Sequence, residues 1–310
     1  MTLAFWSVIR RHLSPVACRL LTVDTQRNNA IFDPHLHLFD LDEGDYFWLK
    51  NALPPWPKIS LIQRNFTPAD LKLPVHFQLD GYAHIEAGFN NDHPAAEIAF
   101  LEQKYKRAHC AISYAQIDQD PHTFKEQIQD FSRYATFVGI RDISEGADAE
   151  RLLKPEVVSN FALLESHQLI FEAQFELHQH PITKRLCDLA KACPTLNIVL
   201  NHAGLVTAES FDDWHTAIKK LARFDNIAIK YSGFEMIDLP LNEPFRKTVL
   251  TTLVTHFGEN RVMFASNFPI CLMTSSYASL WQQYYDLCPN TALWQKLSFA
   301  NAKRIYQIQK

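Results

Sequence analysis

The sequence predicts an α/β fold, a (β/α)8 TIM barrel. Three observations support this: the chain has 310 residues with 47% hydrophobic content, short apolar runs alternate with segments of helical periodicity, and polar residues end nearly every run. Alternating strands and helices favour a parallel sheet, and eight such units favour closure into a barrel.

The predicted strands are the eight short apolar runs, each bounded by polar or turn-forming residues. They cover residues 31–36, 80–86, 110–117, 137–141, 169–175, 197–201, 226–232 and 261–266.

The predicted helices lie between these runs and share apolar residues at one-face spacing, with prolines at several first turns. They cover residues 94–107, 121–134, 149–167, 182–193, 209–223, 243–257 and 276–287.

The stretch 40–79 does not fit the alternation. It carries five prolines and is too long for an ordinary connection after the first strand. We expect it to cover an active site, with Trp48, Trp56 and Arg64 as candidates for setting specificity.

The N-terminal residues 1–28 are expected to form an extension that packs on a single barrel domain, residues 29–310. The first 23 residues contain three arginines and no acidic residue. Their apolar stretch is short and precedes the charges, the reverse of the order in a secretory signal.

Charge and composition limit the partners. The net charge of −4 and the lack of a long basic run argue against nucleic-acid binding. No apolar run reaches the length of about 18 residues needed to span a membrane. The six cysteines show no CxxC spacing, as expected of reduced thiols in a cytoplasmic protein. The sequence leaves a homodimer open as the oligomeric state.

Polar residues at the carboxyl ends of the strands are the main functional signal, because TIM-barrel chemistry occurs at that face. A single one could be a structural group held by hydrogen bonds, but so many are costly to bury without purpose. We expect Asp33, His35 and His37 to share one face of the first strand. Later strands contribute His84, Glu86, Arg141, Glu172, Gln174, Glu176, His178, Asn201, His202, Lys230, Ser232 and Asn267. This ring suits a polar, anionic or hydroxylated small-molecule substrate.

Several segments together resemble the amidohydrolase-2 (amidohydrolase-related) family, and most closely its sugar-lactonase and 2-pyrone-4,6-dicarboxylate lactonase-like branch. They include "DPHLHLFD" followed by "YFWL", "VGIRD", "LNHAGL", "NIAIKYSGF" and "RVMFASNFP". The resemblance covers roughly residues 30–306 in family order and implies a TIM-barrel hydrolase.

The resemblance also implies a metal-binding role for some histidines. His35 and His37 would line the bottom of the pocket, where they hold a divalent metal or polarise a lactone carbonyl. His178 matches a metal ligand of metal-dependent relatives, although His180 is equally near. Catalytic zinc usually takes three protein ligands, so zinc or manganese and a metal-free site both remain open.

One departure from the family stands at the end of the last strand. Most members have Asp in an "SDWP"-like motif, and that Asp activates the attacking water. Here the motif reads "SNFP", with Asn267, and an amide cannot accept a proton near neutral pH. Either His202 or Glu86 is then the base, or the metal site is weakened, or hydrolysis is lost. His84, on the pocket face, keeps the first option open.

The favoured hypothesis is hydrolysis of a sugar-derived or dicarboxylic lactone by water. His202 would act as base or oxyanion donor, while Arg141 and Lys230 neutralise developing negative charge. Asn267 would orient water or substrate. Glu86, Lys230 and Trp48 are the predicted substrate-binding residues.

Two alternatives remain. One is metal-dependent decarboxylation of an aromatic or muconate-type acid, which would need the missing strand-eight Asp. The other is a non-catalytic ligand-binding homologue, for which Asn267 is the main support.

Overall fold

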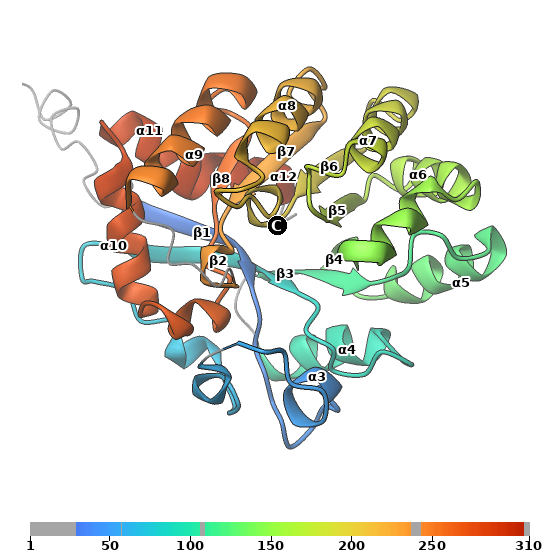
Figure 1. The fold of residues 1–310 in the computed structure, drawn as a ribbon. Helices are drawn as coiled ribbons and strands as arrows, with labels where there is room; N and C mark the ends of the chain where they lie inside the picture. The colour runs from blue at the N-terminus through green and yellow to red at the C-terminus, as the bar shows by residue number, and fades with distance from the viewer. Residues whose placement is uncertain (1–28, 57, 106–108, 237–242, 307–310) are drawn as a thin grey trace, which may run out of the picture.

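A computed structural model describes residues 29–56, 58–105, 109–236 and 243–306. Eight parallel strands pair in sequence order, β1 to β8, so the predicted (β/α)8 barrel is confirmed (Figure 1). The strands are β1 (Ala30–Leu36), β2 (Gln78–Ile85), β3 (His109–Tyr114), β4 (Phe137–Ile143), β5 (Ile170–Gln174), β6 (Asn197–Leu200), β7 (Ile227–Tyr231) and β8 (Val262–Phe264).

The barrel closes between β1 and the segment that follows β8. Leu36 forms a parallel bridge with Phe268. The His37 amide donates to the Phe268 carbonyl at 2.6 Å, and the Asn267 amide donates to the His35 carbonyl at 2.9 Å. This closure places Asn267 directly beside the two histidines of β1.

Helices follow the strands and form the outer layer. They are α3 (Phe47–Lys50), α4 (Ala95–Lys104), α5 (Pro121–Phe131), α6 (Glu156–Ser166), α7 (His180–Ala192), α8 (Phe211–Leu221), α9 (Glu243–Phe257), α10 (Tyr277–Leu287), α11 (Thr291–Gln295) and α12 (Asn301–Tyr306). The predicted helix 149–167 is divided into a 3-10 segment, Gly146–Leu153, and α6. Pro155 explains the break, because a residue that precedes proline is disfavoured in helical conformation.

Helix α5 shows how the local sequence fixes these elements. The Asp120 side chain accepts hydrogen bonds from the first free amides, and Pro121 occupies the first turn. Phe124, Ile128 and Phe131 are buried at one-face spacing. Capping and periodicity together set both the start and the orientation of the helix.

The sequence analysis missed the helices after residue 287. Ala302, Ile305 and Tyr306 of α12 pack with the apolar side chains of the barrel strands, including Phe32 and Met263. The C-terminal helix therefore supplies part of the barrel core, which short helical turns do not reveal from periodicity.

The end of β1 is irregular, at the residues that were predicted to share one face. The pairing of β1 with β2 shifts register between Asp33 and Leu36. Asp33 accepts hydrogen bonds from Tyr277 of α10 at 3.1 Å and from the Ser266 amide at 3.0 Å. It therefore braces the junction of β1, β8 and α10.

The stretch after β1 contains α3 and two 3-10 turns, Ile59–Leu61 and Pro68–Asp70. Trp48 donates from Nε1 to the Ala87 carbonyl at 2.7 Å, which fastens this stretch to the end of β2. Arg64 is 54% exposed and pairs with Asp70 inside the stretch itself. Trp48 therefore reaches the barrel end, whereas Arg64 stabilises the local turn.

Residues 1–28 lie outside the described residues, so their predicted extension is untested. No helix in the described ranges is long and apolar enough to cross a membrane. The five cysteines in the described part of the chain form no disulfide with one another.

Candidate active site

His35 stands between two cationic side chains at the centre of the barrel. Its Nδ1 lies 3.1 Å from Lys230 Nζ, and its Nε2 lies 3.5 Å from Arg141 Nη1. Burial, with added repulsion from Lys230, lowers the pKa of His35 well below its usual value. The imidazole is therefore uncharged near neutral pH.

Lys230 belongs to a saturated cluster deeper in the barrel. Its Nζ lies 2.6 Å from Glu172 Oε2, and Tyr306 donates to Glu172 Oε1 at 2.5 Å. Lys230 and Glu172 are fully buried. Burial lowers the pKa of Lys230 to about 8, although Glu172 opposes the shift. The predicted substrate contact of Lys230 is replaced here by contacts with protein groups.

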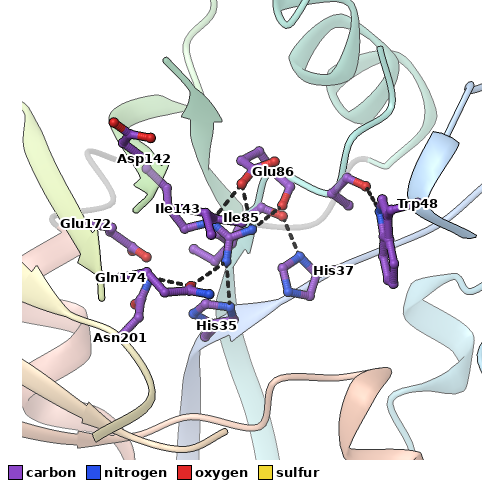
Figure 2. A network of polar contacts seen from close by, with 12 residues as sticks. His35, His37, Trp48, Ile85, Glu86, Asp142, Ile143, Glu172, Gln174 and Asn201 are labelled. Atoms are coloured by element: carbon purple, nitrogen blue, oxygen red, sulfur yellow. Dashed lines mark hydrogen bonds and ion pairs between the residues drawn. The ribbon is translucent and has the colours of Figure 1, made fainter. Parts of the chain in front are cut away.

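Arg141 is held by Glu86 and Gln174, and Figure 2 shows these two partners together with His35 and His37. Its Nε donates to Glu86 Oε1 at 2.7 Å, Nη2 donates to the Glu86 carbonyl at 2.8 Å, and Nη1 donates to Gln174 Oε1 at 3.1 Å. Burial raises the pKa of Glu86 to about 7 against the opposing effect of Arg141. Glu86 is therefore occupied as the partner of Arg141, which acts through its positive potential beside His35.

His37 is fixed at the barrel end by a contact with the backbone of β2. Its Nδ1 lies 2.7 Å from the Ile85 carbonyl, an acceptor, so Nδ1 carries the proton and Nε2 the lone pair. Burial, followed by Arg141, lowers the pKa of His37 well below its usual value. A side-chain hydrogen bond links His37 with Asn267.

His202 follows β6 in a tight turn, with φ of 51° at both His202 and Ala203. Its ring centroid lies 4.5 Å from that of His35, and its Nδ1 lies 3.1 Å from Ser232 Oγ. A Cβ on Gly233 would fall 2.4 Å from His202 Cβ, so only glycine fits beside this imidazole. Burial, then Arg141 and Lys230, lowers the pKa of His202 well below its usual value.

His84 has no free nitrogen. The Leu38 amide donates to its Nδ1 at 3.3 Å, and its Nε2 lies 2.9 Å from Glu97 Oε1. Both ring positions are therefore committed to holding the segment after β1. The expectation that His84 supplies a base on the pocket face finds no support in this geometry.

His178 is exposed to solvent, whereas the histidines of the candidate site are buried. Strand β5 ends at Gln174, and His178 lies exposed in the turn before α7. His180 pairs with Asp213 at the surface, at 3.1 Å. The sequence analysis extended the alternating pattern of β5 from Gln174 to His178, four residues beyond the end of the strand, because alternation does not show where a strand ends.

The three candidate metal ligands, His35, His37 and His178, are not brought together in the structure, because His178 is exposed whereas the other two are buried. In the described ranges no group of three His, Cys, Asp or Glu side chains is arranged to hold a metal ion. Both nitrogens of His35 face cationic groups, which would repel a divalent ion, so His37 Nε2 is the one β1 histidine nitrogen left with a lone pair. These residues, as arranged, do not fit zinc or manganese.

Glu235 is the site residue that the sequence analysis missed. It lies in the 3-10 turn Phe234–Met236 after β7, and Asn267 Nδ2 donates to its Oε1 at 2.7 Å. Burial raises the pKa of Glu235 to about 7. The strand-end search stopped at Ser232; continuing three residues beyond it would have reached this carboxylate.

Two curated relatives cover nearly the whole chain. Protein y4mH of Sinorhizobium fredii, an uncharacterized protein, is 28% identical over 298 residues, 90% of this chain and 99% of its own. L-fucono-1,5-lactonase of Burkholderia multivorans is 23% identical over 291 residues, 84% of this chain and 92% of its own.

Solved structures share the fold. An amidohydrolase from Burkholderia multivorans with bound zinc has a TM-score of 0.73 and 18% identity, covering 90% of this chain and 100% of its own. A putative 2-pyrone-4,6-dicarboxylic acid hydrolase from Pseudomonas putida has a TM-score of 0.65 and 18% sequence identity, and the match covers 91% of this chain and 99% of its own. A 2,6-dihydroxybenzoate decarboxylase from Rhizobium has a TM-score of 0.62 and 15% sequence identity, and the match covers 90% of this chain and 98% of its own.

A family model described as amidohydrolase matches residues 32–308, the span that includes nearly all of the eight strands and every buried histidine of the site. The resemblance read from the motifs is thus confirmed, and the chain belongs to the amidohydrolase family.

Proposed function

We propose that this protein hydrolyses the ester bond of a lactone, either sugar-derived or a cyclic dicarboxylic acid. The observation that carries the proposal is the cluster of three buried, uncharged imidazoles beside Arg141. Similarity to L-fucono-1,5-lactonase and to 2-pyrone-4,6-dicarboxylic acid hydrolases supports the substrate class.

The site suits attack by water on a carbonyl. The rings of His37 and His202 both lie against the ring of His35, with centroids 5.0 Å and 4.5 Å away. A neutral imidazole can both donate and accept a proton, whereas a cationic imidazole can only donate one. Burial also strengthens their hydrogen bonds to a developing oxyanion.

His202 acts according to its tautomer, which Ser232 sets. If Ser232 donates to Nδ1, then Nε2 carries a proton and donates to the carbonyl oxygen. If Nδ1 donates to Ser232, then Nε2 accepts a proton from water. Each role contributes on the order of 10²–10⁴ in rate.

Arg141 and Lys230 supply positive potential rather than direct contacts. Both side chains are buried and committed to carboxylates. Their charges flank His35 and favour negative charge on the tetrahedral intermediate. Trp48, fastened to Ala87, offers an aromatic wall for the substrate at the barrel end.

The reaction is proposed without a resident metal, because both nitrogens of His35 face cationic side chains. A decarboxylase on this barrel would release carbon dioxide rather than open a ring. A binding protein would be stabilised by a ligand without consuming it. These outcomes separate the three hypotheses.

The test is a pH-indicator assay on a panel of aldonolactones and 2-pyrone-4,6-dicarboxylate. It uses chelator-treated protein, with and without added zinc or manganese, and subtracts spontaneous opening. We expect turnover of at least one lactone by the chelator-treated protein, and a fall of about 10²-fold or more in kcat/KM for His202→Ala.

The matched control is His178→Ala, an exposed histidine whose loss should leave kcat/KM unchanged. No turnover of any lactone under either metal condition would refute the proposal. Turnover that appears only with added metal would refute its metal-free form.

A further inference from the structure

Asn267, after β8, has an amide where most family members have a carboxylate. The carboxylate of Glu235, after the neighbouring strand β7, is hydrogen-bonded to this amide. We propose that Glu235 is the general base of this site, positioned by Asn267 and acting on the attacking water. The inference rests on the proposed lactone hydrolysis and names the group that removes the proton.

The geometry links three side chains in a row. Asn267 Nδ2 donates to Glu235 Oε1 at 2.7 Å, and the Asn267 side chain also hydrogen-bonds to His37. Glu235 follows β7 directly, and Asn267 follows β8. Both therefore lie at the carboxyl end of the barrel, where the reacting carbonyl is expected.

Asn267 is suited to hold this carboxylate. Its φ of 53° places the residue in the left-handed region, which Asn tolerates better than most residues. Its backbone amide is fixed by the His35 carbonyl. The amide side chain thus binds Oε1 and orients Glu235, and no other side chain donates to Oε2 in the described part of the chain.

The buried acids Glu86, Glu172 and Asp33 already have partners, unlike Glu235, which is partly buried. Glu86 is bound by Arg141, Glu172 by Lys230 and Tyr306, and Asp33 by Tyr277 and the Ser266 amide. Glu235 has no ion-pair partner in the described part of the chain. Among those residues its carboxylate accepts a hydrogen bond from the Asn267 side chain and one from its own backbone amide.

The electrostatic surroundings suit a base that works near neutral pH. Burial raises the pKa of Glu235 to about 7, against the opposing effects of its hydrogen bonds and of Arg246 in α9. Cys271 and Tyr284 also face it, and burial raises the pKa of both well above their usual values, so both are uncharged. A carboxylate in this state removes a proton better than an ordinary glutamate.

The chemical step balances without another reactant. Water attacks the lactone carbonyl carbon as Glu235 Oε2 takes its proton, giving a tetrahedral oxyanion. The bond from that carbon to the ring oxygen then breaks, and Glu235 returns the proton to the leaving oxygen. The product is a hydroxy acid. With Glu235 as base, the protonated Nε2 of His202 is the oxyanion donor.

The deciding experiment compares four proteins on the best lactone of the panel: wild type, Glu235→Gln, Asn267→Asp with Glu235→Gln, and the control Glu150→Gln, an exposed acid. We expect Glu235→Gln to lose about 10²–10⁴-fold in kcat. Glu150→Gln should match wild type. Thermal unfolding of each protein verifies folding.

The double variant exchanges the carboxylate and the amide across the same hydrogen bond. The amide introduced by Glu235→Gln can donate to the carboxylate introduced by Asn267→Asp. We expect the double variant to recover about tenfold or more over Glu235→Gln, a part of the usual contribution of a general base. Because most family members carry the base at position 267, this recovery shows only that a carboxylate at this end of the barrel restores catalysis, and the pH profile of Glu235→Gln decides the role of Glu235 itself.

The pH profile gives a second readout. The kcat/KM of wild type should fall below about pH 7, because Glu235 must lose its proton to act as a base. The profile of Glu235→Gln should lose that limb.

Full activity and an unchanged pH limb in Glu235→Gln would overturn the role of Glu235 while leaving lactone hydrolysis intact. A wild-type profile without a limb near pH 7 would also overturn it, even if the variant failed to fold. An inactive wild type would refute the proposed hydrolysis itself, and the base with it.

Discussion

The inner cluster of the barrel and the carboxyl end, where we propose that catalysis occurs, both bury titratable side chains but satisfy them differently. In the inner cluster, Lys230, Glu172 and Tyr306 satisfy one another at 2.5–2.6 Å. At the barrel end, His202 and Glu235 each have one side-chain partner. The saturated cluster therefore suits a structural role, whereas the less saturated side chains suit the proposed proton transfer.

The difference follows from the cost of burying charge. An ion inside the barrel must be paired, because an isolated one loses several kcal/mol of solvation. Lys230 and Glu172 meet this need fully. At the barrel end the imidazoles avoid the cost by staying neutral, which also keeps them competent to move protons.

The largest expected effect breaks the inner cluster. Lys230→Met leaves Glu172 buried without its cation, so we expect a loss of about 3–5 kcal/mol in the free energy of unfolding. Chemical denaturation measures it. The control Lys303→Met removes an exposed pair with Asp80 and should cost below about 1 kcal/mol. Equal small losses would show that the inner pair does not have the structural role that we infer.

The next effect concerns the barrel end. Gly233→Ala adds a Cβ that meets His202 at 2.4 Å, at a φ of +83°. Because a displacement of about 1 Å can cost 10²-fold in rate, we expect kcat/KM to fall by about tenfold or more. Gly258→Ala shares the strained φ, +73°, but meets open space. It should keep full activity, and if both variants retain activity, His202 is not held as described.

The smallest effect is a pH slope. His202 is neutral in the folded state because its pKa is lowered, whereas in the unfolded state it takes up a proton below about pH 6.5. Stability is therefore lost as pH falls below about 6.5, by up to about 1.4 kcal/mol per pH unit for this residue.

The measurement is urea unfolding at several pH values between about 5 and 7, on either side of the ordinary histidine pKa. His202→Gln should flatten the dependence of the unfolding free energy on pH by about that slope. His178→Gln, at an exposed position, should leave it unchanged. An identical slope in wild type and His202→Gln would contradict the buried neutral imidazole.

Much of the fold and part of the site followed from local pattern. The eight strand positions were predicted closely, because apolar runs and their spacing are properties of the neighbouring residues themselves. His35, His37, Arg141 and His202 were found because they end such runs, and the barrel brings those ends together.

The partners of these residues were decided by packing in three dimensions. Packing placed His178 in solvent, committed Glu86 to Arg141, and set Glu235 against Asn267. The order of residues along the chain was enough to predict the barrel and most of the side chains at the carboxyl ends of its strands. Protonation and roles depended on burial and on distant contacts, such as that between Glu172 and Tyr306, 134 positions apart, which no local pattern encodes.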